Sequence, residues 1–266
     1  MELNIDLNLL KTEPFEDYRA KTKDFLNWHS LKDFIDCPLL YYKKTQGLIE
    51  DKDSSYFSTG RAAHKRILEG EVTYSSAYAV GGPVNPKTGK PYGTETKAFE
   101  EWALLQGKPV VSHAQNELIS QMADGVAANK NAAELLLNGK AEGVVRSSYC
   151  ATPCQIRIDW LNPTRGLVEF KTTDDLTWFE KDIYNYGYIG QLAFYHSVLM
   201  HELKVSSIPV YLIAVEKREP FRCGVWNISY QTLDQSRERN EKAIKDLLVC
   251  RESNVWPTNY EEIRTL

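Results

Sequence analysis

The stretch of sequence that decides the fold runs from Ile156 to Thr173 and reads IRIDWLNPTRGLVEFKTT. Residues 155–161 and 166–171 are rich in β-branched side chains and alternate in polarity, which is typical of β-strands. The Asn-Pro-Thr-Arg-Gly segment between them is rich in turn-forming residues. We therefore predict two neighbouring strands joined as a hairpin.

Three charged residues stand on this predicted hairpin: Asp159 on the first strand, and Glu169 and Lys171 on the second. Glu169 and Lys171 are two residues apart, so they share one face of their strand, where Asp159 can face them. Converging carboxylates suit Mg²⁺, which stabilises charge on a phosphate and activates a bound water. An adjacent lysine can orient that water or stabilise developing charge. The alternative is a solvated cross-strand ion pair.

The rest of the chain alternates between helical and strand-like patterns. Polar residues 1–27 form a predicted N-terminal arm that packs loosely, and residues 28–266 form one predicted domain. Further strands are expected at 143–149, 208–215 and 223–228, and helices at 30–44, 59–69, 94–106, 113–138, 174–203 and 231–251. Ser30 is the expected cap of the first helix. This order predicts an α/β fold of the mixed α+β type with a central sheet.

Composition narrows the class of protein. The formal net charge is −4 and the isoelectric point about 5.8, which argues against a protein that only coats DNA but not against an enzyme with a local basic patch. No run of about 18 apolar residues indicates a membrane span, and the acidic N-terminus does not resemble a signal peptide. Five irregularly spaced cysteines indicate a reducing, cytoplasmic location.

Two further motifs carry polar groups that could join the same site. Residues 60–69 form a predicted short helix with a single histidine, His64, which is either an imidazole metal ligand or an incidental residue. Gln191 and Tyr195 lie four residues apart and share one face of a predicted helix. They either hydrogen-bond a phosphate and a backbone oxygen, or they are buried groups of an aromatic core helix.

The order of these motifs is more specific than any one of them. Along the chain come a helix with Cys37-Pro38, Gly-x-x-x-His at 60–64, Asp159, Glu-x-Lys at 169–171 and Gln-x-x-x-Tyr at 191–195. This order resembles the RecB-like branch of the PD-(D/E)XK nuclease superfamily, and within it the RecE-type exonucleases, over residues 28–260.

The resemblance implies a restriction-endonuclease-like core, a mixed sheet flanked by helices, and a role for each motif residue. The implied metal ligands are His64, Asp159, Glu169 and the carbonyl of Phe170. The implied catalytic residues are Asp159, Glu169, Lys171, Gln191 and Tyr195. Glu142 resembles an acidic position ahead of the catalytic strands in relatives, so it is expected as an accessory acid near the metal or the DNA end.

The sequence also departs from the family pattern. Ile158 precedes the first acid where the superfamily name has Pro, and the second acid is Glu169 where RecE-type sequences often have Asp. Some RecB-like nucleases hold an iron–sulfur cluster with a first Cys at the position of Cys37 and three clustered Cys near the C-terminus. Only Cys223 and Cys250 lie in that region here, far apart, so we expect no cluster.

The activity implied by the resemblance is Mg²⁺-dependent degradation of one strand of linear double-stranded DNA, with Mn²⁺ expected to substitute. RecE-type members work from a 5′ end and leave a 3′ overhang for a single-strand annealing protein, in recombination of phages and mobile elements. They are similar to ring-shaped oligomers, so a homo-oligomer is expected. The residues expected to contact DNA phosphates are Arg61, Lys65, Arg66 and Arg157.

Three alternatives stay open at this point. The first is an endonuclease or a single-strand nuclease of the same superfamily. The second is a catalytically silent protein that binds DNA ends in recombination, although two close carboxylates repel each other and favour a site with a cation. The third is a structural domain in which Glu169 and Lys171 form a surface pair.

Overall fold

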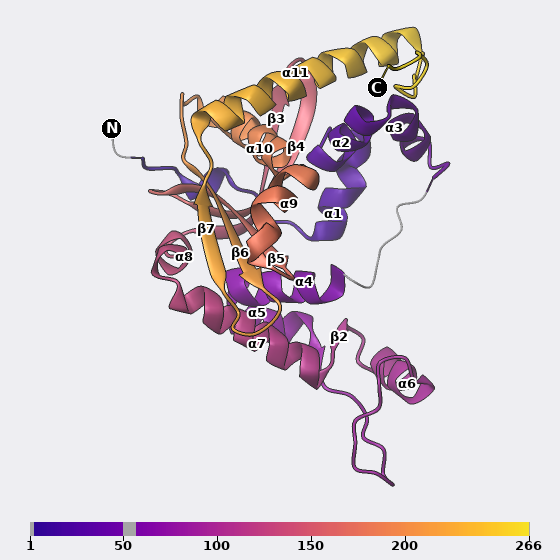
Figure 1. The fold of residues 1–266 in the computed structure, drawn as a ribbon, viewed down its shortest axis with the longest axis vertical. Helices are drawn as coiled ribbons and strands as arrows, with labels where there is room; N and C mark the ends of the chain where they lie inside the picture. Colours follow the sequence, from indigo (N-terminus) through magenta and orange to yellow (C-terminus); the bar gives the residue numbers. More distant parts are fainter. Residues whose placement is uncertain (1–2, 50–56, 266) are drawn as a thin grey trace.

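The computed structural model describes residues 3–49 and 57–265, and its centre is one five-stranded sheet (Figure 1). The strands lie in the order β3 (Lys140–Tyr149), β4 (Thr152–Asn162), β5 (Gly166–Thr173), β6 (Val210–Glu216) and β7 (Cys223–Asn227). Only β5 and β6 are parallel; the other neighbours are antiparallel. The predicted mixed α/β fold with a central sheet flanked by helices is confirmed.

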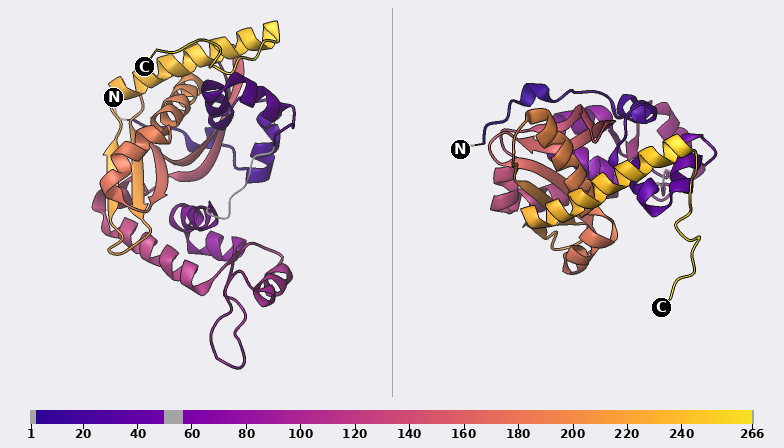
Figure 2. Two further views of the ribbon diagram at one scale, coloured as in Figure 1. Left: turned by 45° about the vertical axis from the view of Figure 1, so that its right-hand side comes forward. Right: turned by 90° about the horizontal axis from the view of Figure 1, so that it is seen from above.

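Helices cover both faces of the sheet (Figure 2). One face packs against α2 (Trp28–Asp36), α10 (Tyr188–Leu203) and α11 (Tyr230–Ser253), and the other against α4 (Phe57–His64), α7 (His113–Ala128) and α8 (Lys130–Leu135). Side chains of β5 alternate between the two cores: Leu167 faces the α10 side, whereas Val168 and Phe170 face the α7 side. Buried strands with two covered faces explain the near-continuous apolar runs.

The starts of α2 and the helix that follows it are set by Asn27 and Pro38. The side chain of Asn27 accepts a hydrogen bond from the Ser30 backbone N–H at 2.9 Å, so α2 starts two residues before the predicted cap. Pro38 ends the predicted helix at 30–44 and begins α3 (Pro38–Thr45), where its missing N–H costs nothing. The expectation of one helix capped by Ser30 is therefore wrong.

The described part of the N-terminal segment is firmly packed, which corrects the expectation of a loose arm. Ile5, Leu10 and Leu26 are buried in the α10-side core. Two isolated bridges join the segment to free edges of the sheet, Lys11 to Val144 and Leu26 to Cys154. Its helical pieces are η1 (Leu7–Leu9), α1 (Phe15–Ala20) and η2 (Lys21–Lys23).

The middle of the chain is more divided than predicted. After α4 the chain forms a π-helical turn, η3 (Lys65–Glu69), then α5 (Gly70–Ala77), β1 (Ala79–Val80), α6 (Lys97–Leu105) and β2 (Val110–Val111). The predicted helix at 113–138 is split at Asn129, whose side chain caps α8. The predicted helix at 174–203 comprises η4 (Leu176–Trp178), α9 (Phe179–Asn185) and α10. Among the described residues, no helix is long and apolar enough to cross a membrane.

Candidate metal centre

The two strands of the predicted hairpin, β4 and β5, stop pairing where Asp159 and Glu169 lie. Pairing between β4 and β5 covers Trp160↔Val168, Leu161↔Leu167 and Asn162↔Gly166, and stops before Asp159. The backbone N–H of Phe170, which would otherwise face a partner on β4, donates to Asp159 Oδ2 at 2.8 Å. Since the N–H and carbonyl of one strand residue point to the same side, strand geometry also directs the Phe170 carbonyl toward this gap.

A kink in β3 lies opposite the gap. Glu142 has φ 55°, a left-handed conformation that is costly for a residue with a Cβ. The pairing of β3 with β4 runs on either side of it, at Ala141↔Trp160 and Gly143↔Ile158, but skips Glu142 and Asp159. Such backbone strain costs about 1–3 kcal/mol and gathers at functional sites. At Glu142 the backbone therefore gives up regular strand pairing and places the side chain toward Asp159 and His64 instead.

His64 joins the two carboxylates that the kink and the gap bring together. Its Nε2 lies 3.0 Å from Asp159 Oδ2, and its Nδ1 lies 2.9 Å from Glu142 Oε1. Burial alone would lower the pKa of His64, but the charges of Asp159 and Glu142 outweigh it and raise the pKa to about 10. The π-helical turn η3 follows directly after His64, and such turns are frequent at functional sites.

Glu169 is a buried acid, and one of its two carboxylate oxygens has no hydrogen-bond partner among the described residues. Its side chain is 1% exposed, and its Oε1 accepts hydrogen bonds from Lys171 Nζ and, at 2.8 Å, from Gln191 Nε2. Its Oε2 is buried without a hydrogen-bond partner among the described residues. Burial, with the charge of Asp159, raises the pKa of Glu169 to about 7. An unsatisfied buried carboxylate oxygen is unfavourable unless a cation or donor meets it.

These groups fit a divalent cation. Ligand atoms of His64, Glu142 and Asp159 all lie within 4.8 Å of one another. Glu169 is close enough to Asp159 to be affected by its charge, and its unpartnered oxygen is a further candidate ligand. Oxygen ligands with one imidazole suit Mg²⁺ or Mn²⁺. Against the opposing effect of burial, the positive charges of His64 and Lys171 hold the pKa of the Asp159 carboxyl at about 2. A bound cation would take the place of the proton on the ligating ring nitrogen of His64, because only the neutral imidazole binds a metal.

Glu142 lies behind His64 and is held there by Arg157. One carboxylate oxygen accepts from His64, and the other accepts from Arg157 Nε. Arg157 also donates to the backbone carbonyl of Glu13 at 3.0 Å. A carboxylate that binds the second ring nitrogen of a ligating histidine fixes the tautomer and orientation of the ring. These contacts make Glu142 a candidate for orienting His64, a role that the sequence did not predict.

Lys171 is more exposed than its partner Glu169, with 22% of its side chain exposed against 1%. Its Nζ contacts Glu169 and sits 5.2 Å from the centre of the Tyr188 ring. Burial lowers the pKa of Lys171, but Glu169 and Asp159 outweigh it and hold the pKa above its usual range. Lys171 is therefore a cation rather than a base, which suits stabilisation of negative charge.

Gln191 and Tyr195 are both buried side chains of α10. Gln191 donates to Glu169, and Tyr195 lies one turn further along the helix, behind Gln191. This placement is that of residues that position Glu169. Gly190, next to Gln191, allows the close approach of α2, because a Cβ there would lie 2.2 Å from the Trp28 ring.

The four residues expected to contact phosphates differ in their surroundings. Lys65 pairs with Glu69 at 2.7 Å, and Arg66 pairs with Glu71 at 2.6 Å. Arg157 is engaged by Glu142 and Glu13, as described above. Arg61 lies on the exposed surface of α4. Their contact with DNA stays a prediction.

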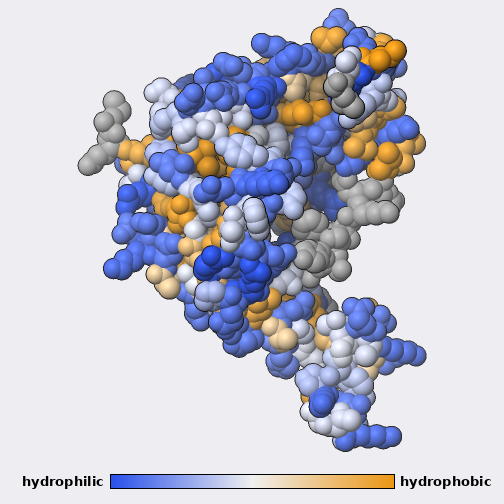
Figure 3. Space-filling view, in the orientation of Figure 1, coloured by the Kyte–Doolittle hydropathy of each residue, from blue (hydrophilic) through white to orange (hydrophobic). Residues whose placement is uncertain are grey.

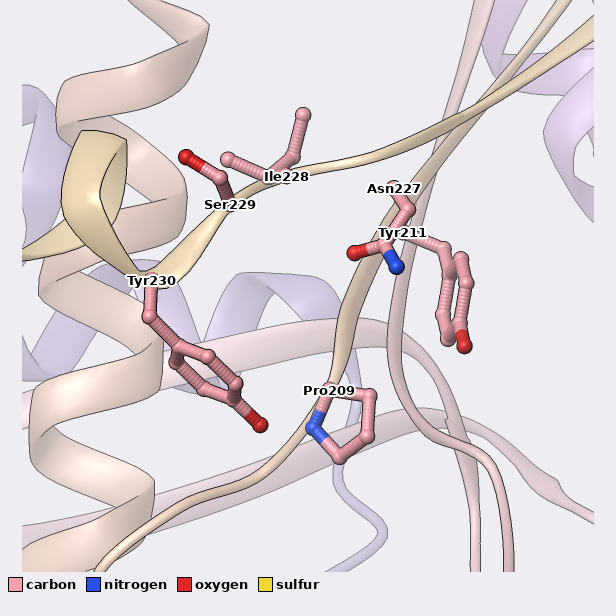
Figure 4. A pocket seen from close by; sticks show the side chains of 6 residues that line it. All are labelled: Pro209, Tyr211, Asn227, Ile228, Ser229 and Tyr230. Carbon is pink, nitrogen blue, oxygen red and sulfur yellow. The ribbon is translucent and has the colours of Figure 1, made fainter.

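The surface has a hollow and a separate pocket, and the pocket is not part of the candidate metal centre. Figure 3 shows the surface hollowed between the upper part, which carries α2 and α3, and the lower part, which carries α4. The pocket in Figure 4 lies instead where β6 begins, β7 ends and α11 starts, and its lining residues are Pro209, Tyr211, Asn227, Ile228, Ser229 and Tyr230. It contains none of the candidate metal ligands.

Comparison with known proteins agrees with the fold. Residues 28–266 match the family described as a PDDEXK-like domain of unknown function (DUF3799). The structure is similar to a "Putative exonuclease" from Eubacterium rectale, with a TM-score of 0.68, 13% sequence identity and 96% of each chain covered. A likeness to LHK-Exo in complex with dAMP, with a TM-score of 0.30 and 13% identity over 60% of this chain and 88% of the other, is too weak to support an inference. No curated protein matches this chain.

Proposed function

Because the chain belongs to the PDDEXK-like family over residues 28–266, we propose that it is a metal-dependent exodeoxyribonuclease that hydrolyses phosphodiester bonds of linear double-stranded DNA. The observation that carries this proposal is the buried Glu169, whose Oε2 has no partner among the described residues. Burial and the charge of the neighbouring Asp159 raise the pKa of Glu169, and a protonated Lys171 lies next to it. A stability-only role would leave that oxygen unexplained.

The residues that would hold the cation are His64, Asp159, Glu169 and the carbonyl of Phe170. When bound, Mg²⁺ or Mn²⁺ neutralises charge on the scissile phosphate and activates a water. Lys171 places a fixed positive charge where negative charge develops during attack. Gln191 holds Glu169 in position, and Glu142 holds the His64 ring.

Finer assignments within this proposal rest on the order of the motifs, which resembles RecE-type exonucleases. They comprise 5′-to-3′ digestion, a single catalytic domain over residues 28–266, a cytoplasmic role in recombination of phages or mobile elements, a single-strand annealing partner and assembly into a homo-oligomeric ring.

The test is digestion of a linear duplex and the matching closed circle, with Mg²⁺ and with EDTA. Wild type should remove only the linear form and only with Mg²⁺, and Glu169→Gln should remove neither. Glu134→Ala, a change at an exposed acid on α8, is the matched control and should digest like wild type. Nicking of the circle would indicate an endonuclease instead, and DNA binding without digestion would indicate the silent end-binding protein.

A further inference from the structure

Aromatic side chains crowd the segment that follows the catalytic strand. Within residues 178–186, Trp178 is 65% exposed, Tyr184 69% and Tyr186 57%. Single exposed aromatics are ordinary on protein surfaces, whereas a cluster beside a site indicates a binding surface. The segment connects β5, which carries Glu169 and Lys171, to α10, which carries Gln191.

One of these rings, Tyr186, and the neighbouring ring of Tyr188 form a path outward from the metal centre. Tyr188 lies over Lys171, with 5.2 Å between Nζ and the ring centre. Tyr186 lies next to Tyr188, with ring centres 5.8 Å apart and planes inclined by 39°. Gly187 between them is the N-cap residue of α10 and has φ 76°, a left-handed conformation that suits glycine.

A basic side chain borders the same path. A Cβ built on Gly187 would lie 3.6 Å from Cε of Lys32, on α2. The tyrosine pair is therefore flanked by Lys171 at its inner end and by Lys32 along its side. Aromatic rings with neighbouring cations are the combination that binds single-stranded nucleic acid, because the rings stack on bases and the cations meet phosphates.

We propose that Tyr186 and Tyr188 stack against unpaired bases of the DNA strand next to the scissile phosphate, so that the preferred substrate is a frayed, single-stranded terminus. The inference rests on the proposed nuclease function and adds its substrate form. Bases inside a duplex are already stacked on their neighbours, so their faces become available to protein rings only after the strands separate. Stacking is tolerant of base identity, so no sequence preference is expected.

The strongest test removes the Tyr186 ring from the protein and, separately, the unpaired bases from the DNA. Affinity is measured by fluorescence anisotropy in the cleavage-inactive Glu169→Gln background, with Mg²⁺ present. The DNA is a duplex with a short unpaired 5′ end, and a second version carries abasic residues at the unpaired positions. We compare two substitutions of the same residue, Tyr186→Ala and Tyr186→Phe. The matched control is Tyr260→Ala, at an exposed tyrosine near the C-terminus.

Tyr186→Ala should weaken binding of the base-bearing end by about 5- to 140-fold, the range of base–aromatic stacking. The abasic end should show a similar loss with the parent protein and no further loss with Tyr186→Ala. Tyr186→Phe keeps the ring, so it should bind like the parent, as should Tyr260→Ala. Thermal melting of Tyr186→Ala should match the parent, because an exposed ring buries little surface.

Two results would overturn the inference. If Tyr186→Ala binds the base-bearing end as tightly as the parent, or if the parent does not distinguish base-bearing from abasic ends, the tyrosine pair does not stack on bases. Digestion by the wild-type protein separates this failure from that of the nuclease proposal. Intact digestion of linear duplex with either result refutes the stacking alone, whereas absence of both digestion and binding refutes both proposals.

Discussion

Two buried glutamates on neighbouring strands of the sheet differ in how their carboxylate oxygens are satisfied, and only one of them belongs to the candidate metal centre. Glu169 on β5 and Glu216 on β6 each have side chains 1% exposed. Both oxygens of Glu216 are satisfied, by Arg222 and by the backbone N–H of Leu176, and the Arg222 guanidinium holds its pKa below the usual range. Glu169 has an unpartnered oxygen and a raised pKa. Burial alone therefore does not separate the candidate catalytic carboxylate from Glu216; the unpartnered oxygen of Glu169 does.

The largest effect should come from removing the charges on β5. Lys171→Ala and Glu169→Gln should each lower the digestion rate by at least about 100-fold, the usual result of losing one group that stabilises developing charge. Circular dichroism should show an unchanged fold. Lys97→Ala, at an exposed lysine on α6, should digest normally, and a Lys171→Ala protein that cleaved at the wild-type rate would remove this lysine from the mechanism.

A cation should stabilise only the protein that has the unmet oxygen. Mg²⁺ or Mn²⁺ at 100 times its dissociation constant should stabilise the wild-type fold by about 2.7 kcal/mol, seen as a rise in melting temperature. Glu169→Ala should lose most of that rise. Glu216→Gln should keep it, since Glu216 belongs to another cluster. An equal rise in all three proteins would mean that the cation binds elsewhere.

The structural acid should show itself in stability and not in digestion. Glu216→Gln leaves Arg222 with a weaker partner, so denaturant unfolding should show a loss of about 1–3 kcal/mol. Digestion per folded molecule should not change. The reverse pattern, lost digestion with unchanged stability, would contradict the distinction between the two acids.

A smaller effect concerns pH. The pKa of Glu216 in the folded protein lies below its ordinary value of 4.5, so its contribution to stability is present above about pH 4.5 and is lost as the pH falls further. Unfolding of wild type and Glu216→Gln, measured at neutral pH and near pH 3, should therefore differ less at the lower pH. A gap that widened in acid would refute the assignment.

Local patterns explain what was predictable. Alternation over residues 155–171 reports a strand hairpin directly, because side-chain direction in a strand depends only on its own backbone. For that reason the proximity of Asp159, Glu169 and Lys171 follows from spacing. His64 needed the family resemblance, since the sequence around it indicates only a helix.

Long-range placement explains the rest. Nothing near Glu142 in the sequence indicates its left-handed backbone, which becomes favourable only when His64 and Arg157 meet its carboxylate. The contact of Arg157 with Glu13 joins residues 144 positions apart. Gly190 stands next to Gln191 in the sequence, and this was the one available signal for close packing there. The reason for the glycine is visible only in the fold, where the Trp28 ring leaves no room for a Cβ.

The N-terminal segment has a consequence for aggregation. Lys11 exchanges two backbone hydrogen bonds with Val144, at 2.9 and 2.8 Å, and Leu26 bonds to the backbone of Pro153 and Gln155. These contacts close stretches of β3 and β4 that would otherwise present open strand edges, the surfaces on which chains add to one another in fibrils. A protein trimmed to the family-matched residues 28–266 would keep every candidate catalytic side chain and yet be expected to precipitate.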